Sequence, residues 1–372
     1  MSNYSQDKDF AELDEMMGFD PTNTQIFNSV EGSATPQDVY RTSPKDSKTE
    51  DGHYHSKVRL LYNVHNRKRT IVHTATYNMK DADGFFYAQS LLGESDPNSP
   101  YFSEYKNCPI FKAWKKLHFS EDPTGDERAK KYFQKTEADW ILVQVVEDKN
   151  QPEMVGKILP WKLPRAVLVK LQSKMAPSKD SGKAAVNLLD LLIGRVLDID
   201  VTPGPQDKTD PTRYYRETKY DLSEFDVDPV PVMKVDGTPL FTEDEIEQIE
   251  KYDKKMTAIA KMKSPEEKEN AFKLLKENAL YATIRELMQR AYEYVKANSK
   301  DLVESKGFKP WSDELTERVQ KYIGTVLAGK DPVGEGGYQP DGSDIDAIFS
   351  GAKPAVQPNA VPESQTDDDL PF

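Results

Sequence analysis

Residues 140–175, WILVQVVEDKNQPEMVGKILPWKLPRAVLVKLQSKM, contain the pattern that decides the fold. Trp140–Val146 is a strongly apolar run of strand length, and a loop with Gln and Pro separates it from a second run that begins near Val155. Apolar residues then recur at helical spacing over Arg165–Met175. The order strand, loop, strand, helix predicts a small β core with inserted helices.

Further β-rich runs flank this segment. Val58–Val64 and Thr70–Tyr77 are separated by the turn-like His65–Lys68, so they are predicted to form a hairpin. Gly194–Val201 and Tyr214–Leu222 also have the composition of strands. Short strands with few intervening helices predict an α+β fold with an antiparallel β-barrel similar to the oligonucleotide-binding (OB) fold.

The chain changes character on both sides of this core. From Phe241 helical periodicity runs to about residue 298, and Thr242 with Glu245 can form a capping box. A last helix is expected over 312–327. The two ends are polar and acidic, although Phe10–Met17 has the spacing of a brief amphipathic helix. The expected parts are a mostly disordered arm at 1–54, an OB-like core at 55–235, an α-helical region at 236–329 and a disordered acidic tail at 330–372.

The net charge of −13 is unevenly distributed. Residues 1–50 contain 4 basic and 10 acidic side chains, and residues 330–372 contain 2 and 9, which leaves the middle balanced at 44 against 44. A basic binding surface is therefore expected locally, within the core. No apolar run is long enough to cross a bilayer, and the single cysteine, Cys108, excludes an internal disulfide, so we expect a cytoplasmic protein.

Three stretches of the core, 57–80, 106–118 and 154–179, contain basic residues and no acid. Each run alone is better explained as a solvated face, and each aromatic alone as core. Together they predict a groove for single-stranded DNA, in which cations contact phosphates and aromatic rings stack on unpaired bases. The candidate DNA-binding residues are Lys57, Arg59, Tyr62, Arg67, Lys68, Arg69, Tyr77, Tyr105, Lys106, Lys112, Trp114, Lys115, Lys116, Lys157, Trp161, Lys162, Arg165, Lys170, Arg213 and Tyr215.

The last six residues form a different motif. They are Asp367, Asp368, Asp369, Leu370, Pro371 and Phe372. The phenylalanine ring can fill a shallow apolar pocket on a partner while the carboxylates meet a basic rim. An acidic solubilising tail would leave the terminal Leu-Pro-Phe unexplained, so we expect a docking tip for other proteins.

Two known families resemble parts of this chain. The tip at 367–372 is similar to that of bacterial single-stranded-DNA-binding proteins, with Leu370 where isoleucine is usual, which implies recruitment of replication and repair proteins. Residues 57–260 resemble the single-strand-binding protein of T-even bacteriophages at Asn107–Ile110 and from Trp140 to the helix at Arg165. This second resemblance implies an OB core that coats single strands in phage DNA replication, recombination and repair, within a bacterial host cytoplasm.

The chain departs from the phage family at its zinc site. That family has a structural zinc bound by one histidine and three cysteines, whereas here only Cys108 is present and Phe111 stands where a second thiolate would be. A Cys-rich zinc site cannot be built with one cysteine. We expect packing of Ile110, Phe111, Trp114 and Leu117 to stabilise this region instead.

No enzyme motif is present in the sequence. It has no Gly-rich phosphate loop, nucleophile elbow or zinc-protease helix, so we expect a non-enzymatic protein without cofactor or metal. His53–His55 could bind a metal, but solvated loop histidines are the favoured explanation. Asp81–Asp83 and Asp198–Asp200 could hold magnesium, but a turn and a strand edge are favoured. The rival functions are a protein-only replication adaptor or scaffold, and a nuclease.

Overall fold

The computed structural model describes residues 39–91, 108–177, 184–262, 264–306 and 310–334. They belong to two compact units. The first draws on the ranges 1–78, 87–105 and 135–312, and the second on 79–86, 106–134 and 313–372. The helix predicted at 10–17 and the docking tip at 367–372 lie outside the described residues.

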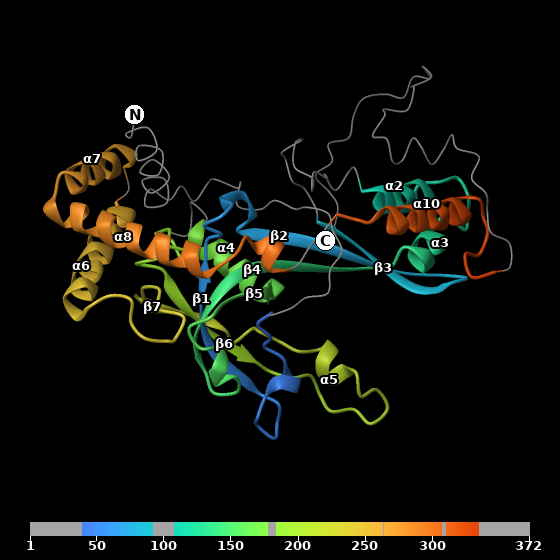
Figure 1. Ribbon diagram of the computed structural model, residues 1–372, viewed down its shortest axis with the longest axis horizontal. Coiled ribbons are helices and arrows are strands. Elements are labelled where there is room, and N and C mark those ends of the chain that lie inside the picture. The colour runs from blue at the N-terminus through green and yellow to red at the C-terminus, as the bar shows by residue number, and fades with distance from the viewer. Residues whose placement is uncertain (1–38, 92–107, 178–183, 263, 307–309, 335–372) are drawn as a thin grey trace, which may run out of the picture. The chain divides into compact units, whose positions relative to one another are not determined.

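The first unit is built on a seven-stranded antiparallel sheet (Figure 1). The strand order is β3-β2-β4-β1-β6-β7, and β5 pairs with β4. This sheet with inserted helices confirms the predicted fold class. The strands are β1 Tyr54–Leu61, β2 Ile71–Asp81, β3 Gly84–Leu91, β4 Lys135–Asp148, β5 Ile158–Leu163, β6 Arg195–Val201 and β7 Glu224–Pro229.

Strand β4 pairs with three other strands. Its residues 135–141 pair with β2, its residues 142–148 pair with β1, and residues 139–144 pair with β5 along the other edge. The predicted hairpin of 58–64 with 70–77 is therefore wrong. A strand of 14 residues is long enough to pair with β2 along its first half and with β1 along its second half.

The predicted helices agree closely with the structure. Helix α4 spans Arg165–Met175 and buries Val167, Leu168, Leu171 and Met175, the residues that gave its periodicity. Helix α6 spans Glu243–Lys261 and begins at the capping box of Thr242 and Glu245. The strand predicted at Tyr214–Leu222 is wrong. The short helix α5, Arg213–Arg216, forms there, with Arg213 paired to Glu217 one turn later at 2.8 Å.

The C-terminal helices of the first unit share the core of the sheet. Helix α7 spans Pro265–Lys276, α8 spans Ala279–Asn298 and α9 spans Leu302–Ser305, and α6, α7 and α8 lie together in Figure 1. Ile249, Ile284 and Met288 belong to one buried cluster with the strands. The boundary expected at residue 235 thus divides elements that are packed together.

Residues 39–54 were expected to belong to a disordered arm, but they pack on the sheet. Tyr40 is buried, its hydroxyl donates to Asp148 at 2.6 Å, and its backbone N–H donates to the carbonyl of Pro160 at 3.0 Å. Thr42 is also buried and accepts a hydrogen bond from the indole of Trp161 at 3.0 Å. Burial raises the pKa of Tyr40, so its hydroxyl stays a donor. The contacts of Tyr40 and Thr42 join this part of the arm to the sheet.

The described residues of the second unit form three helices and the tip of the β2–β3 hairpin. Helix α2 spans Pro109–His118, α3 spans Gly125–Tyr132 and α10 spans Asp313–Leu327. Arg318 of α10 makes two hydrogen bonds of 2.7 Å to Asp81, and these hold the pKa of that carboxyl below its ordinary value. Tyr322 of α10 packs edge-on against Phe86, with ring centroids 5.6 Å apart.

The packing expected around α2 is only half right. Ile110 and Leu117 are buried as predicted, whereas Phe111 and Trp114 are only partly buried and stack on one another with centroids 5.6 Å apart. Helix α10 supplies much of the missing core, because Val319, Tyr322 and Ile323 are buried. A helix more than two hundred residues away in sequence could not be assigned to this unit by local pattern.

Arg59 is the most deeply buried cation of the sheet. Its side chain is 0% exposed and donates to the carbonyls of Gly194, Val230 and Asp190. Burial lowers the pKa of Arg59 to about 10, and it raises the pKa of the neighbouring Asp190 carboxyl. The arginine therefore ties β1 to the loop that precedes β6.

Replacing Arg59 with Met should reduce the free energy of unfolding by about 3–5 kcal/mol, because three buried carbonyls and the Asp190 carboxyl lose their donor or counter-charge. Urea denaturation measures this loss. The matched control is Lys57→Met on the same strand, whose two ion pairs are long and partly exposed; it should cost about 1 kcal/mol or less. Equal small losses in both variants would contradict the structural role of Arg59.

Candidate functional site

A cleft of about 490 Å³ lies in the first unit, beside β4 and β5. Its walls are residues 39–44, Trp140 of β4, the segment 161–164 that ends β5, and residues 215–220. We call it the aromatic cleft. The segment 39–44 lies there because of the Tyr40 and Thr42 contacts, and the pairing of Trp140 with Lys162 fixes the other side.

Three cations gather at the aromatic cleft. Arg41 and Lys162 line it and are exposed. No carboxylate of the described residues forms an ion pair with either of them. Lys306, just after α9, is 4% exposed, and its ammonium lies 3.9 Å from the centroid of the Trp140 ring. Burial first, and then the charges of Arg41 and Lys162, lower the pKa of Lys306 to about 8. Such a cluster of like charges favours an anionic ligand.

Aromatic rings form the rest of the cleft. Trp140 is partly buried and its indole donates to Thr74 at 3.2 Å. Tyr215 is 44% exposed, with the ammonium of Lys45 4.4 Å from its ring centroid. Trp161 is only 1% exposed and forms part of the floor. The partly exposed rings of Trp140 and Tyr215 can stack on a flat ligand, and the nearby cations can bind its charge.

The structure brings some of the predicted residues into this cleft. Trp161, Lys162 and Tyr215 line it, and the exposed Arg165 follows closely on β5. Sequence reasoning missed Arg41, Lys45, Trp140 and Lys306. Arg41 and Lys45 lay in the arm that was expected to be mostly disordered. Trp140 lay in a strongly apolar run, and Lys306 lay in the α-helical region, for which no DNA contact was predicted. Only tertiary structure places them together.

Other predicted DNA-binding residues lie inside the protein. Arg59 is engaged with three carbonyls, and Tyr62 and Tyr77 are each 1% exposed. The Tyr62 hydroxyl donates to Asn187 at 3.0 Å. In this conformation these side chains cannot reach a ligand. Arg59 and Tyr77 lie in strands as predicted, whereas Tyr62 follows directly after the end of β1. The β-rich pattern could not show that these side chains are covered.

Four predicted cations are paired with acidic residues of the same unit. Lys57 lies 4.0 Å from both Asp198 and Asp226, Arg69 lies 3.5 Å from Asp301, Lys170 lies 2.9 Å from Glu224, and Arg213 lies 2.8 Å from Glu217. Lys68 and Lys157 are exposed, and the Arg67 guanidinium lies 5.5 Å from the ring centroid of Tyr62. These residues are outside the aromatic cleft.

Four further predicted residues belong to the second unit. Lys112, Trp114, Lys115 and Lys116 all lie on α2. The ring of Trp114 stacks nearly parallel with Phe111 and with His118, at centroid distances of 5.6 and 4.6 Å. Trp114 therefore already has aromatic neighbours on the helix surface. Tyr105, Lys106 and the tip 367–372 lie outside the described residues.

Comparison with known proteins gives one family match. The family model described as gp32 DNA binding protein like matches residues 52–280, which is more than half of the 372-residue chain. The match includes Trp140, Trp161, Lys162 and Tyr215 of the aromatic cleft, but neither Arg41 nor Lys306. A search of curated proteins found no match. Within the described ranges, no helix has the length and apolar character needed to cross a membrane.

The pKa of Lys306 tests the cation cluster directly. Nuclear magnetic resonance of ¹³C-labelled lysine should show Lys306 titrating near pH 8, and Lys162→Gln should raise its pKa because one repelling charge is removed. Lys254→Gln on α6, outside the cleft, should leave the pKa of Lys306 unchanged. If Lys162→Gln has no effect on it, the three cations are not close enough to interact.

Proposed function

The chain belongs to the family of gp32-like DNA-binding proteins, and from this premise we propose that it coats single-stranded DNA without sequence specificity through the aromatic cleft. The observation that carries the proposal is the meeting of Arg41, Lys162 and Lys306 around the ring of Trp140. Single-strand binders combine two components, cations that attract the phosphate backbone and exposed aromatic rings that stack on bases. Both are present in this cleft.

Each component has a distinct role in this proposal. The exposed side chains of Arg41 and Lys162 contact backbone phosphates, which carry the same charge at every nucleotide. Trp140 and Tyr215 stack on bases, and every base has a flat face, so the contact tolerates any sequence. Lys306 adds positive charge beneath the Trp140 ring. Binding then depends on charge and stacking, and very little on base identity.

The same arrangement favours single strands over duplexes. A base within a duplex is stacked on both faces and paired along its edge, so it must leave the helix before it can enter a cleft between protein walls. An unpaired base enters without that cost. We propose that the protein acts stoichiometrically and not as an enzyme, keeping transient single strands open during replication, recombination and repair in the cytoplasm of a phage-infected bacterium.

The acidic tip has a separate role in this proposal. Residues 367–372 recruit replication and repair proteins by inserting Phe372 into a partner pocket with a basic rim. Because the tip is anionic and tethered, it also competes with DNA for the aromatic cleft. The rival adaptor function uses the tip alone and predicts no affinity for single strands.

Substitutions in the cleft should weaken DNA binding in two different ways. Lys162→Ala should reduce affinity for a poly-dT oligonucleotide and make the log–log salt slope shallower by about 0.7, the contribution of one phosphate contact. Trp140→Ala should reduce affinity by roughly tenfold or more through lost stacking, with little change in the salt slope. Fluorescence anisotropy over a range of salt concentrations measures both quantities.

The control for both variants is Lys254→Ala, which removes an exposed positive charge of the same unit from α6, outside the cleft. It should leave affinity and salt slope nearly unchanged. If Lys254→Ala weakens binding as much as Lys162→Ala, the attraction comes from overall charge and not from the cleft.

Deletion of residues 362–372 should strengthen binding to single-stranded DNA and abolish capture of partner proteins. The first effect follows because an anionic competitor is removed, and it should be largest at low salt, where charge attraction is least screened. Anisotropy measures the DNA affinity, and a pull-down from host lysate measures the capture. Unchanged DNA affinity would refute the competition while leaving the docking role intact.

A further inference from the structure

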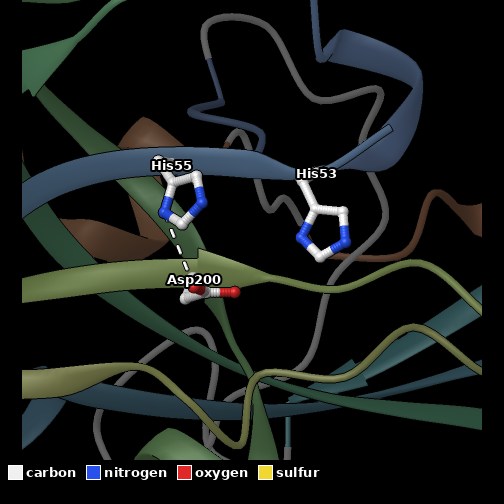
Figure 2. Close-up of side chains that lie close together, drawn as sticks. All are labelled: His53, His55 and Asp200. Atoms are coloured by element: carbon white, nitrogen blue, oxygen red, sulfur yellow. Dashed lines mark ion pairs between the residues drawn. The ribbon is translucent and has the colours of Figure 1, made fainter. Parts of the chain in front are cut away.

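Two histidines and an aspartate meet on the solvent side of the sheet, at the end where β1 begins (Figure 2). His55 is the cross-strand partner of Asp200 on β6, and His53 lies two residues before His55, so its side chain projects to the same face. One donor atom from each of the three lies within 4.8 Å of the donors of the other two. Figure 2 shows the rings of His53 and His55 side by side above Asp200.

The spacing is close to that of a metal site. Two donors bound at about 2.0–2.2 Å to a tetrahedral ion are roughly 3.3–3.6 Å apart. Nδ1 of His55 already lies 3.6 Å from Oδ2 of Asp200. Only the remaining donor, from His53, has to approach, and side-chain rotation provides that movement. Imidazole nitrogens with a carboxylate oxygen suit Zn²⁺ and related transition metals, whereas Mg²⁺ prefers oxygen ligands alone.

The backbone that carries these side chains is already fixed. The carbonyl of His53 accepts hydrogen bonds from the hydroxyls of Ser47 and Thr49, and its N–H donates to Asp51 at 3.1 Å. On the other strand the N–H of Asp200 donates to Ser223 at 3.0 Å. The two strands add their ladder hydrogen bonds, so an ion has to order side chains only.

The turn before His53 is held from a further element. The hydroxyl of Tyr214 on α5 donates to the carbonyl of Asp51 at 3.1 Å. Gly52 has a φ of 73°, and a Cβ at this position would lie 1.6 Å from the Tyr214 hydroxyl. Only glycine fits at this position of the turn, and the turn leads directly to His53.

An ordinary ion pair joins His55 and Asp200, and His53 interacts electrostatically with the Asp51 carboxyl, but neither interaction joins all three side chains. Within the described residues, the ring of His53 makes no hydrogen bond. A bound ion gives all three side chains one common partner. The cluster does not use Cys108, and it shares no side chain with the aromatic cleft.

We propose that His53, His55 and Asp200 bind one divalent transition-metal ion, with Zn²⁺ as the preferred occupant and water completing its coordination. The ion links the turn at 47–53 to β6. Because residues 39–44 of the same segment line the aromatic cleft, the ion stabilises the N-terminal wall of that cleft. This goes beyond DNA binding, and the site binds its ion with or without DNA.

Calorimetric titration of the chelator-treated full chain with ZnCl₂ tests the site, with MgCl₂ as the comparison. One saturable Zn²⁺ site is expected, and magnesium should give none. His53→Gln, His55→Gln and Asp200→Asn should each weaken Zn²⁺ binding by tenfold or more. The matched control is His65→Gln, an exposed histidine whose ring lies 3.0 Å from the Ser299 carbonyl, and it should bind Zn²⁺ like the unmodified chain.

Thermal melting supplies a second readout that does not depend on heats of binding. Zn²⁺ should raise the melting temperature of the unmodified chain and of His65→Gln, because a ligand that binds only the folded state stabilises it. The three site variants should melt like the unmodified protein without metal, which shows that they fold, and should gain nothing from Zn²⁺. Absence of a saturable site, or an equal loss in His65→Gln, would overturn the proposal.

Discussion

The pairing of β4 with three neighbours is the constraint on which the rest of this structure depends. Hydrogen bonds to β2, β1 and β5 fix the strand along both edges. Trp140 near its middle is thereby placed opposite Lys162, and Asp148 at its end accepts hydrogen bonds from both Tyr40 and Tyr54. The first contact builds one wall of the aromatic cleft. The second anchors the N-terminal segment that supplies the opposite wall, so one strand positions both.

Local periodicity predicted the parts of the fold that depend on neighbours in sequence. Helix α4 and the capped start of α6 were found at their predicted residues, and the antiparallel sheet with inserted helices was confirmed. The β1–β2 hairpin was wrong because proximity in sequence suggested pairing, whereas the long apolar β4 satisfies both strands. Of the residues that line the cleft, Trp161, Lys162 and Tyr215 were predicted from the sequence, because they stand in acid-free or aromatic stretches. Arg41 and Lys306 stand in segments whose composition gave no indication of binding, and only long-range contacts bring them to Trp140.

In the part that the structure describes, contacts between segments far apart in sequence hold the second unit together. Cys108 is buried at the start of α2 and is the only cysteine of the chain. The unit is held by α10, whose Arg318 pairs with Asp81 of the hairpin and whose Tyr322 donates to the backbone carbonyl of Tyr132 at 2.9 Å. These partners are far apart in sequence. The unit therefore joins segments that lie on both sides of residues 135–312 in the sequence.

The most direct test of the account is a titration of the full chain with a poly-dT oligonucleotide at low and moderate salt, with duplex DNA of equal length as the control. The four tryptophans include Trp140 and Trp161 of the cleft, and their fluorescence is the signal. Stacking on Trp140 predicts strong quenching by the single strand, loss of affinity as salt rises, and a weak response to duplex. Absence of binding even at low salt, or equal affinity for duplex and single strand, would contradict the proposed role of the aromatic cleft.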